Sequence, residues 1–288
     1  MGDCVYVNGE VVPREDAKVS PFDRGFLYGD GLFETIRAYA GVPFMLDAHL
    51  HRMGASAAAL GIPMPERAEL GEAVTRLIEL NQLGDAYVRI TVTRGLHTGA
   101  LAPAEPAEPT VLVEARKLHP YPPELYANGA TVVVSSLRHD SDSPLRRHKT
   151  TNYLLSILAK REARERGADE ALLLDAAGHV AEGTTSNIFC VRRHGGRDST
   201  LLTPPLDMNI LPGITRATVL DLAPEAGIET GETRFTLDDL CSADEIFLTN
   251  SLMEVMPVRS VDDREFTGAP GPTTRAMAQS YGQLVARR

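Results

Sequence analysis

One lysine has the type and setting of an amine nucleophile. The chain has four lysines, and Lys149 lies in the segment Arg146-Arg147-His148-Lys149-Thr150-Thr151-Asn152-Tyr153, just before an expected helix. An amine held by the start of a rigid element points in a fixed direction, which suits formation of an imine. By itself, such a segment is more typical of a solvated basic run.

A carboxylate among apolar residues is the second candidate for chemistry. Glu182 lies in Val180-Ala181-Glu182-Gly183-Thr184-Thr185-Ser186-Asn187-Ile188-Phe189. A buried carboxylate needs a partner, because an unpaired buried charge is costly. Glu182 is therefore either part of a structural ion pair or the holder of a proton on the ring nitrogen of a cofactor.

Three further sites could bind phosphate. Gly213 comes directly before an expected helix, whose free N–H groups and dipole favour anions, and Thr215 adds a hydroxyl. Arg52 offers a planar guanidinium, and Ser251 follows the end of an expected strand. Taken alone, the glycine site is at least as typical of an ordinary turn, Arg52 is more typical of a surface arginine, and Ser251 is unremarkable. Together with a lysine and an acid, they match what pyridoxal 5'-phosphate requires.

Composition excludes several classes of function. The 288 residues are 43% hydrophobic and 24% charged, with a net charge of −10 and a pI near 5.3. This acidity argues against nucleic-acid and membrane-surface partners, which call for a basic face. The three cysteines are far apart and have no metal or disulfide spacing. No signal peptide and no membrane span is evident, so we expect a cytoplasmic protein that binds no metal.

The first half reads as a small mixed domain. Asn8-Gly9 predicts a hairpin between strands 4–7 and 10–12. A glycine-rich loop leads to a second hairpin, 33–39 with 42–46. Asp47 is the expected cap of a helix that ends near residue 60, and a second helix covers 66–81. Strands follow at 86–93 and 110–115, joined by an Ala/Pro-rich loop.

The second half begins after a proline-rich linker. Residues 131–135 form an apolar run that predicts a strand buried on both faces. The helix after Lys149 is expected to have Thr150 or Thr151 as its cap and Gly167 at its end, with an apolar stripe made of Leu154, Ile157, Leu158 and Ala163. Strands are predicted at 170–175, 179–191 and 245–249, and helices are predicted from just after Gly213 to about Ala223 and over 272–286.

Six motifs in order resemble the class IV aminotransferases, the fold-type IV pyridoxal phosphate enzymes. They are Tyr28 to Glu34, His49 to Met53, Lys149 to Tyr153, Glu182 to Phe189, Pro212 to Arg216, and Thr249 to Val258. The resemblance implies that Lys149 forms the Schiff base and that Glu182 partners the pyridine nitrogen. It also implies cofactor-binding roles for Arg52, Thr185, Ile214, Thr215 and Ser251.

The resemblance also implies the fold and the assembly. It predicts an α+β chain with a small α/β domain at 1–118, a linker at 119–128 and a larger barrel-like domain at 129–288. The active site would lie between the domains and be completed by a loop of a second subunit, so a homodimer is expected. Amino acids and 2-oxo acids would be the substrates.

The subfamily is open at this point. Branched-chain aminotransferases have one more residue before the Asn-Tyr pair, and Gly-Glu-Asn where this chain has Thr185-Ser186-Asn187. D-amino-acid aminotransferases resemble the chain at Lys149 and Glu182. Aminodeoxychorismate lyases, which release pyruvate, resemble it at Asn250 to Met253. We expect transamination, with the lyase as the alternative. The predicted substrate pocket comprises Tyr28, Phe33, Arg37, Arg94, His97, Tyr153, Leu252 and Met253, with Arg37 and Arg94 as candidates for the substrate carboxylate.

Overall fold

The computed structural model describes residues 3–96, 99–103, 108–194 and 199–287. It divides into two compact units. The first comprises Met1–His119 with His148–Asn152, and the second comprises Pro120–Arg147 with Tyr153–Arg288. Lys149 therefore belongs to the first unit although most of its neighbours in the sequence belong to the second. Each unit is described by itself below.

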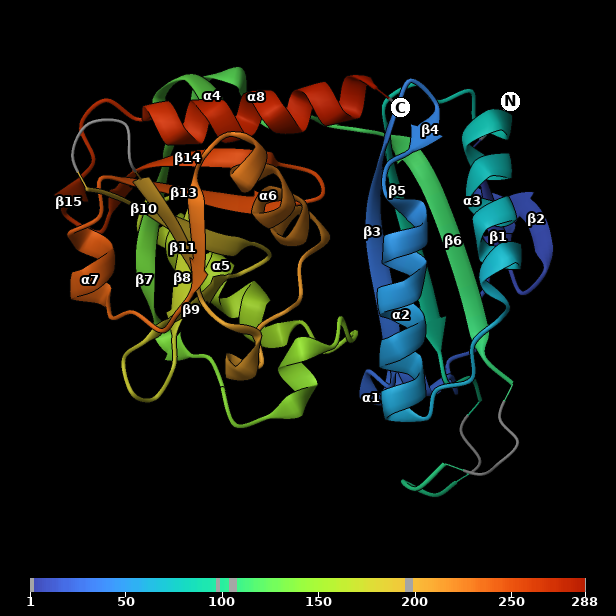
Figure 1. The fold of residues 1–288 in the computed structure, drawn as a ribbon. Coiled ribbons are helices and arrows are strands. Elements are labelled where there is room, and N and C mark those ends of the chain that lie inside the picture. Colours follow the sequence, from blue (N-terminus) through green and yellow to red (C-terminus); the bar gives the residue numbers. More distant parts are fainter. Residues whose placement is uncertain (1–2, 97–98, 104–107, 195–198, 288) are drawn as a thin grey trace. The chain divides into compact units, whose positions relative to one another are not determined.

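The first unit is an antiparallel sheet with helices on one face (Figure 1). Its strand order is β2 (Glu10–Pro13), β1 (Cys4–Val7), β6 (Thr110–Lys117), β5 (Ala86–Thr93), β3 (Gly31–Tyr39) and β4 (Val42–Pro43). Helices α2 (Leu46–Leu60) and α3 (Arg67–Leu80) cover the sheet. Because side chains alternate along a strand, Leu32, Ile36 and Val88 point into this core with Leu50 and Leu77 of the helices.

Most predictions for the first unit are confirmed. Asn8 and Gly9 have φ of 47° and 97°, as a hairpin turn of this kind requires. Two details were wrong. The second hairpin ends at Pro43, and Met45, not Asp47, is the N-cap of α2, while Asp47 lies in its first turn. The expected loop contains a short helix, α1 (Arg24–Tyr28), whose N-cap Asp23 accepts the N–H of Gly25.

The second unit is built on a curled mixed sheet (Figure 1). The strand order is β12 (Glu229–Glu232), β11 (Ser199–Thr203), β10 (Asn187–Arg193), β13 (Glu245–Asn250), β14 (Glu254–Val261), β7 (Ala130–Arg138), β8 (Glu170–Leu174) and β9 (Val180–Gly183), and β15 (Arg264–Glu265) pairs with β14. Strand β7 runs parallel to both neighbours, β8 and β14, and its apolar run lies inside the sheet as predicted.

Helices flank this sheet. They are α4 (Pro123–Asn128), α5 (Leu154–Glu165), α6 (Ile214–Glu225), α7 (Leu237–Cys241) and α8 (Pro272–Ala286). Short 3-10 turns occur at η1 (Arg14–Asp16) in the first unit and at η2 (Pro144–Arg147) and η3 (Leu206–Met208) in the second. The predicted strand 179–191 is in fact two strands, β9 and β10, which are separated by residues 184–186.

The prediction for the helix after Lys149 was wrong at its start and for Leu154 and Ile157 of its apolar stripe, and right for Ala163. Helix α5 has Tyr153 as its N-cap, without a side-chain capping bond. Leu154 and Ile157 are 67% and 59% exposed, whereas Ala159 and Ala163 are fully buried against the sheet. The small residues therefore form the packed face. Its end is as predicted, since Gly167 follows the C-cap with φ of 72°.

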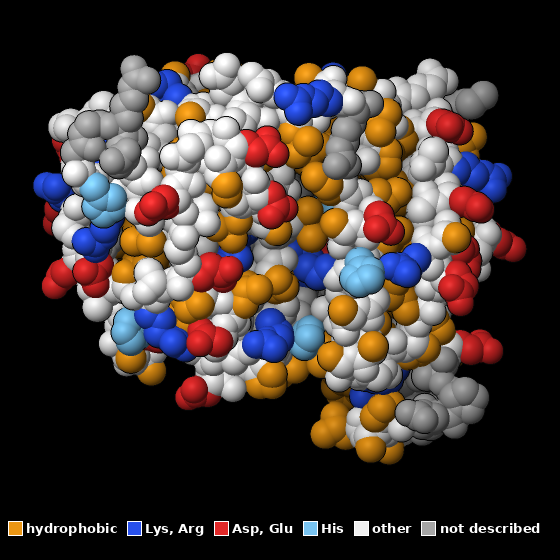
Figure 2. Space-filling model, in the orientation of Figure 1, with side chains coloured by type: hydrophobic (Ala, Val, Ile, Leu, Met, Phe, Trp, Pro, Cys, Tyr) orange, Lys and Arg blue, Asp and Glu red, His pale blue; other side chains and the backbone are white. Residues whose placement is uncertain are grey.

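The surface carries charges of both signs. In Figure 2, acidic and basic side chains are interspersed over the face shown. Within the described ranges, no helix combines the length and apolar character that crossing a membrane would need.

Candidate functional site

The backbone around Lys149 is fixed to the beginning of strand β3. The N–H of Phe33 donates to the carbonyl oxygen of Lys149 at 2.9 Å, and the N–H of Thr151 donates to Gly31 at 2.9 Å. Thr150 pairs with Leu32 as an isolated antiparallel bridge. The segment is thus extended, which suits β-branched threonines better than a helix start. The amine of Lys149 lies 4.7 Å from the centre of the Phe33 ring.

A glycine permits this close approach. Gly29 has φ of 67°, and its carbonyl oxygen accepts the Thr151 hydroxyl at 2.7 Å and the Asn152 amide at 2.9 Å. A Cβ at Gly29 would lie 2.6 Å from Oδ1 of Asn152. The glycines of the early motif therefore make room for the lysine segment, which lies far later in the chain.

Arg52 is held by a buried carboxylate. Its Nε donates to Oε1 of Glu34 at 2.8 Å and its terminal nitrogen donates to Oε2 at 2.6 Å. Nδ1 of His49 lies 2.7 Å from the same Oε2. Glu34 and His49 are 1% and 2% exposed. Two elements, β3 and α2, thus fix the direction of the Arg52 guanidinium.

The charges of this cluster depend on one another. Burial opposes ionisation of Glu34, but the Arg52 charge and the His49 hydrogen bond outweigh it and hold the pKa of Glu34 far below its usual value. Burial lowers the pKa of His49, against the pull of Glu34, and the positive charges of Arg52 and Lys149 lower it further. Glu34 is thus a buried anion that is paired with the permanent positive charge of Arg52. Its second partner, His49, is harder to protonate than an ordinary histidine.

In the second unit, Glu182 lies on β9 and is 7% exposed. Its Oε2 accepts the N–H of Leu211 at 3.1 Å. Its Oε1 lies 3.5 Å from a guanidinium nitrogen of Arg146 and 3.7 Å from Nδ1 of His139. The carboxylate that the sequence singled out is therefore buried and compensated, as a buried charge must be.

The start of α6 comes shortly after Leu211, whose N–H bonds this carboxylate. The N-cap of the helix, Gly213, has no side chain to accept its first N–H groups. The Asn187 amide donates to the carbonyl oxygen of Leu211 at 2.9 Å, and a Cβ on Gly213 would lie 2.0 Å from Oδ1 of Asn187. This glycine thus brings β10 and the beginning of α6 together and leaves amides available for an anion.

A turn after β13 joins the same region. Oδ1 of Asn250 accepts the N–H groups of Leu252 and Met253 at 2.9 and 2.8 Å, which shapes the turn that carries Ser251. The Asn250 side chain also donates to the carbonyl oxygen of Thr185 at 3.2 Å. The second unit therefore gathers five of the predicted cofactor residues, namely Glu182, Thr185, Ile214, Thr215 and Ser251.

An arginine that the motifs did not reveal lies beside Phe33. The guanidinium carbon of Arg89 is 3.8 Å from the ring centre, so this arginine and Lys149 both contact Phe33. Tyr87, Arg89 and Thr91 alternate with buried valines and isoleucine along β5. That alternation was visible in the sequence and marks these side chains as facing away from the helices.

The other predicted pocket residues lie in different surroundings. Arg94 donates to Asp30 at 2.8 Å and to the carbonyl oxygens of Leu60 and Gly61 at the end of α2. The guanidinium of Arg37 lies 4.4 Å from the Tyr39 ring centre.

Tyr28 ends α1 and is 44% exposed, whereas Met253 is buried in the core of the second unit. Tyr153 is the N-cap of α5, and Leu252 is partly buried. His97 lies outside the described residues.

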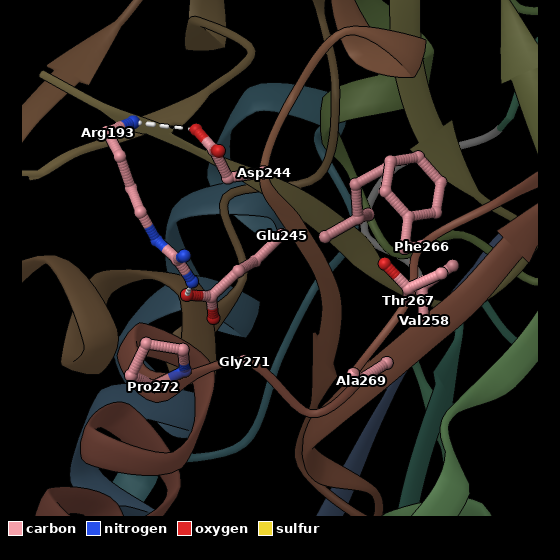
Figure 3. Close-up of a pocket in the computed structure, with 11 residues that line it drawn as sticks. Arg193, Asp244, Glu245, Val258, Phe266, Thr267, Ala269, Gly271 and Pro272 are labelled. Carbon is pink, nitrogen blue, oxygen red and sulfur yellow. Dashed lines mark hydrogen bonds and ion pairs between the residues drawn. The ribbon is translucent and has the colours of Figure 1, made fainter. Parts of the chain in front are cut away.

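A cleft in the second unit has a structural role. It is lined by Arg193, Glu245, Phe266, Gly271 and Pro272 among others, and Figure 3 shows Arg193 and Glu245 pointing toward each other. The carboxylate of Glu245 accepts the Arg193 guanidinium at 2.6 Å and the N–H of Thr274 at 2.8 Å. The side chains that line this cleft fix the start of α8, and the cleft shares no residue with the sites above.

Comparisons with known proteins identify the family. The family model of class IV amino-transferases matches residues 31–261. A "Putative branched-chain-amino-acid aminotransferase" of Methanocaldococcus jannaschii is 45% identical, over 97% of this chain and 96% of that protein. The aminodeoxychorismate lyase of Bacillus subtilis is 35% identical, over 98% of this chain and 94% of the lyase.

A solved structure matches the fold. The branched-chain amino acid aminotransferase of Escherichia coli has a TM-score of 0.90 and 33% identity, and the match covers 99% of this chain and 95% of that one. The predicted α+β fold of two domains, with a separate small sheet and a larger curled sheet, is confirmed. The chain is an enzyme and belongs to the class IV aminotransferase family.

Proposed function

We propose that this enzyme transfers the amino group of a branched-chain amino acid to a 2-oxo acid, with pyridoxal 5'-phosphate as its cofactor. The observation that carries the substrate class is the full-length similarity to a protein named for that activity, at 45% identity. Two local differences from branched-chain enzymes, at Thr150-Thr151 and Thr185-Ser186-Asn187, argue against that subfamily. The 45% identity to that protein, against 35% to the Bacillus subtilis lyase over a similar share of the chain, supports the branched-chain class despite these differences.

The residues fit the cofactor in chemical type. The bound cofactor would supply an electron sink for the amino acid's α-carbon and a carrier for its amino group. Its phosphate calls for the amides of Ile214 and Thr215, the Ser251 hydroxyl and the Arg52 guanidinium. The uncapped start of α6, where Gly213 leaves N–H groups available, supports this assignment.

Lys149 would hold the cofactor covalently and move a proton. Its carbonyl oxygen and the N–H of Thr151 are both bonded to β3, so its amine extends from a fixed segment of backbone. Once released by the substrate amine, Nζ would take the proton from the α-carbon and deliver it to the carbon that takes up the amino group. Glu182 would keep a proton on the ring nitrogen, for which a compensated, buried carboxylate is suited.

For the substrate carboxylate, Arg89 is supported best. It shares the Phe33 ring with the Lys149 amine, at 3.8 and 4.7 Å. Arg37 and Arg94 stay predictions, and Arg94 would have to leave Asp30 to act in this way. Arg89→Lys is expected to raise KM for the amino acid more than Arg94→Lys does, and equal effects would contradict the assignment.

We also propose a homodimer, as the family resemblance implies. Several large apolar side chains of the first unit are exposed, including Phe22 at 67%, Phe26 at 75% and Leu101 at 76%. Exposed apolar side chains of this size are typical of surfaces that another chain covers. Sedimentation equilibrium measures the mass directly, and a monomer at micromolar concentration would contradict this part of the proposal.

The deciding experiment follows the cofactor's absorbance while single amino acids are added. L-Leucine, L-valine and L-isoleucine are expected to convert the bound cofactor to its amino form, and D-alanine and D-glutamate are not. Conversion by D-amino acids alone would overturn the substrate class.

The lyase is tested beside it, since the Bacillus subtilis lyase is also similar over most of its length. Formation of 4-aminobenzoate from aminodeoxychorismate without any response to amino acids would replace transamination by elimination. Borohydride reduction followed by peptide mass spectrometry is expected to place the cofactor on Lys149. Lys149→Ala is the control, and a label on another residue in the intact chain would contradict the assigned role.

A further inference from the structure

His139 is a buried histidine with one ring nitrogen already committed. It directly follows β7 and is 1% exposed. Its Nε2 lies 2.9 Å from the carbonyl oxygen of Met208, and since a carbonyl only accepts, Nε2 carries a hydrogen. The His139 backbone N–H donates to Leu174 at 2.8 Å. The ring is therefore held at Nε2 and the backbone at β8, and Nδ1 is the position where a second proton would bind.

Nδ1 faces the carboxylate that the proposed function uses. It is buried, lies 3.7 Å from Oε1 of Glu182, and forms no hydrogen bond within the described part of the chain. A neutral ring thus presents a lone pair to a carboxylate oxygen, which is unfavourable. A proton on Nδ1 would turn this contact into a charge-assisted attraction.

Arg146 shares the same carboxylate oxygen. One of its terminal nitrogens lies 3.5 Å from Oε1 of Glu182, while Oε2 is bonded to the Leu211 N–H. We propose that His139 is a positioning residue that holds or releases a proton at Nδ1 and so sets how much of the Glu182 charge is left for its other neighbours. Arg146 supplies the permanent part of this compensation and His139 the variable part.

The charged groups near His139 come from several elements. Arg146 belongs to η2, Asp140 is the next residue in the chain, Asp175 follows β8, and Glu182 lies on β9. The 3-10 turn η3 contributes the Met208 carbonyl. Burial lowers the pKa of His139, and Arg146 adds to this, while the Met208 bond and the two aspartates oppose it. His139 is thus neutral at pH 7 and gains its proton under acidic conditions.

The functional consequence rests on the proposed role of Glu182 at the cofactor's ring nitrogen. With His139 neutral, the carboxylate keeps most of its charge for a protonated ring nitrogen. With His139 protonated, two cations share Oε1, and the ring nitrogen is held less strongly. Acidification of the buried pair would therefore weaken protonation of the ring.

The coupling can be measured without cofactor. The chain is labelled with ¹⁵N-histidine, prepared free of cofactor, and its ring nitrogens are followed by NMR against pH. Glu182→Gln is expected to lower the midpoint for protonation of Nδ1 by about one pH unit, since an anion beside it is removed. Arg146→Gln is expected to raise the same midpoint, since a cation is removed. Opposite shifts in two variants exclude a general loss of structure.

An unchanged midpoint in both variants, or a neutral ring with its hydrogen on Nδ1, would overturn the proposal. In the loaded enzyme, His139→Gln keeps a donor for Met208 but has no site for the proton, whereas His139→Asn loses that donor. Both are expected to lack the acidic transition in cofactor absorbance, and a transition retained in both would contradict the proposal. If the chain takes up no cofactor, the proposed function fails while the NMR titration still decides the coupling.

Discussion

Arg52 and Glu34 form a bidentate ion pair. Nε of Arg52 donates to Oε1 of Glu34 at 2.8 Å, and a terminal nitrogen of Arg52 donates to Oε2 at 2.6 Å. The carboxylate is buried and has His49 as its second partner. Such a pair adds little net stability against an apolar alternative, because desolvation offsets the attraction. Its value is geometric, since it gives a flexible arginine a single direction.

Arg52→Lys tests this geometric role. The lysine keeps the charge but loses the planar fork, so it cannot satisfy both Glu34 oxygens while reaching a phosphate. We expect the dissociation constant for pyridoxal 5'-phosphate to rise about tenfold, equivalent to ~1.4 kcal/mol. Equilibrium dialysis measures it. Arg76→Lys, on the exposed face of α3, is the matched control. Equal affinities in the two variants would contradict a phosphate role for Arg52.

The buried cluster predicts how stability depends on pH. The folded-state pKa of His49 is lowered, so the unfolded chain takes up a proton first as pH falls through about 6.5. Stability from His49 is therefore complete above that pH and lost below it. Glu34 also has a lowered pKa, so its contribution is present above its ordinary value of 4.5 and is lost at more acidic pH.

Urea unfolding at pH 7.5 and pH 5.5 measures the first of these losses. His49→Gln removes the titrating ring, and we expect its stability to change less between the two pH values than that of the unmodified chain. His51→Gln, on the exposed side of α2, serves as the control. The same pH response in all three proteins would assign the loss to other groups.

The sequence predicted most strands because local patterns decided them. The hairpin at Asn8-Gly9 and the alternation in β5 need no distant partner to be recognised. The candidate acid was also accessible, since Glu182 stands between apolar strand residues and proves to be buried. These features are local, so one sequence carries enough information to find them.

The surroundings of Lys149 could not be predicted in the same way. Thr150 pairs with Leu32, which is remote in the chain, and this pairing replaces the helix cap expected from the threonines. Leu154 and Ile157 are exposed because the opposite face of α5 packs on the sheet. That face carries the small residues Ala159 and Ala163, which fit against the strands. Local pattern does not encode such tertiary choices.

Gly213→Ala is predicted to destabilise the second unit. A Cβ there would lie 2.0 Å from Oδ1 of Asn187, so the chain before α6 or the asparagine must move. We expect a loss of about 1–3 kcal/mol in the free energy of unfolding, as for other overpacked sites. Chemical denaturation measures it, and cofactor affinity should fall as well if α6 binds the phosphate.

Gly282→Ala is the matched control for that substitution. Gly282 lies inside α8, and a Cβ added there would meet nothing within 4 Å. Alanine should therefore raise the free energy of unfolding by about 0.5–1 kcal/mol, because its helix propensity is higher. Opposite signs for the two glycines are expected. A neutral or stabilising Gly213→Ala would show that the contact with Asn187 is not required.

Glu245→Gln is predicted to loosen the start of α8. The carboxylate accepts the N–H groups of Thr273 and Thr274 and the Arg193 guanidinium, at 3.1, 2.8 and 2.6 Å. Burial opposes its ionisation, but these bonds outweigh burial and lower its pKa. Glutamine keeps one acceptor oxygen but loses the negative charge. In the unmodified chain that charge stabilises the N-terminus of the helix. We expect a loss of about 1–3 kcal/mol at pH 7.

The loss should shrink as pH falls below the ordinary glutamate value, because protonation removes the same charge from the unmodified chain. Urea unfolding of both proteins at pH 7 and pH 4 measures the difference. Glu265→Gln, exposed on β15, should be neutral at both pH values. Exchange of the amide hydrogens of Thr273 and Thr274 gives a local readout, since both amides donate to Glu245 and should be protected less in the glutamine variant. Equal protection in the two proteins would mean that the first turn of α8 is stable without the carboxylate charge. The contacts of Glu245 would then contribute by packing alone.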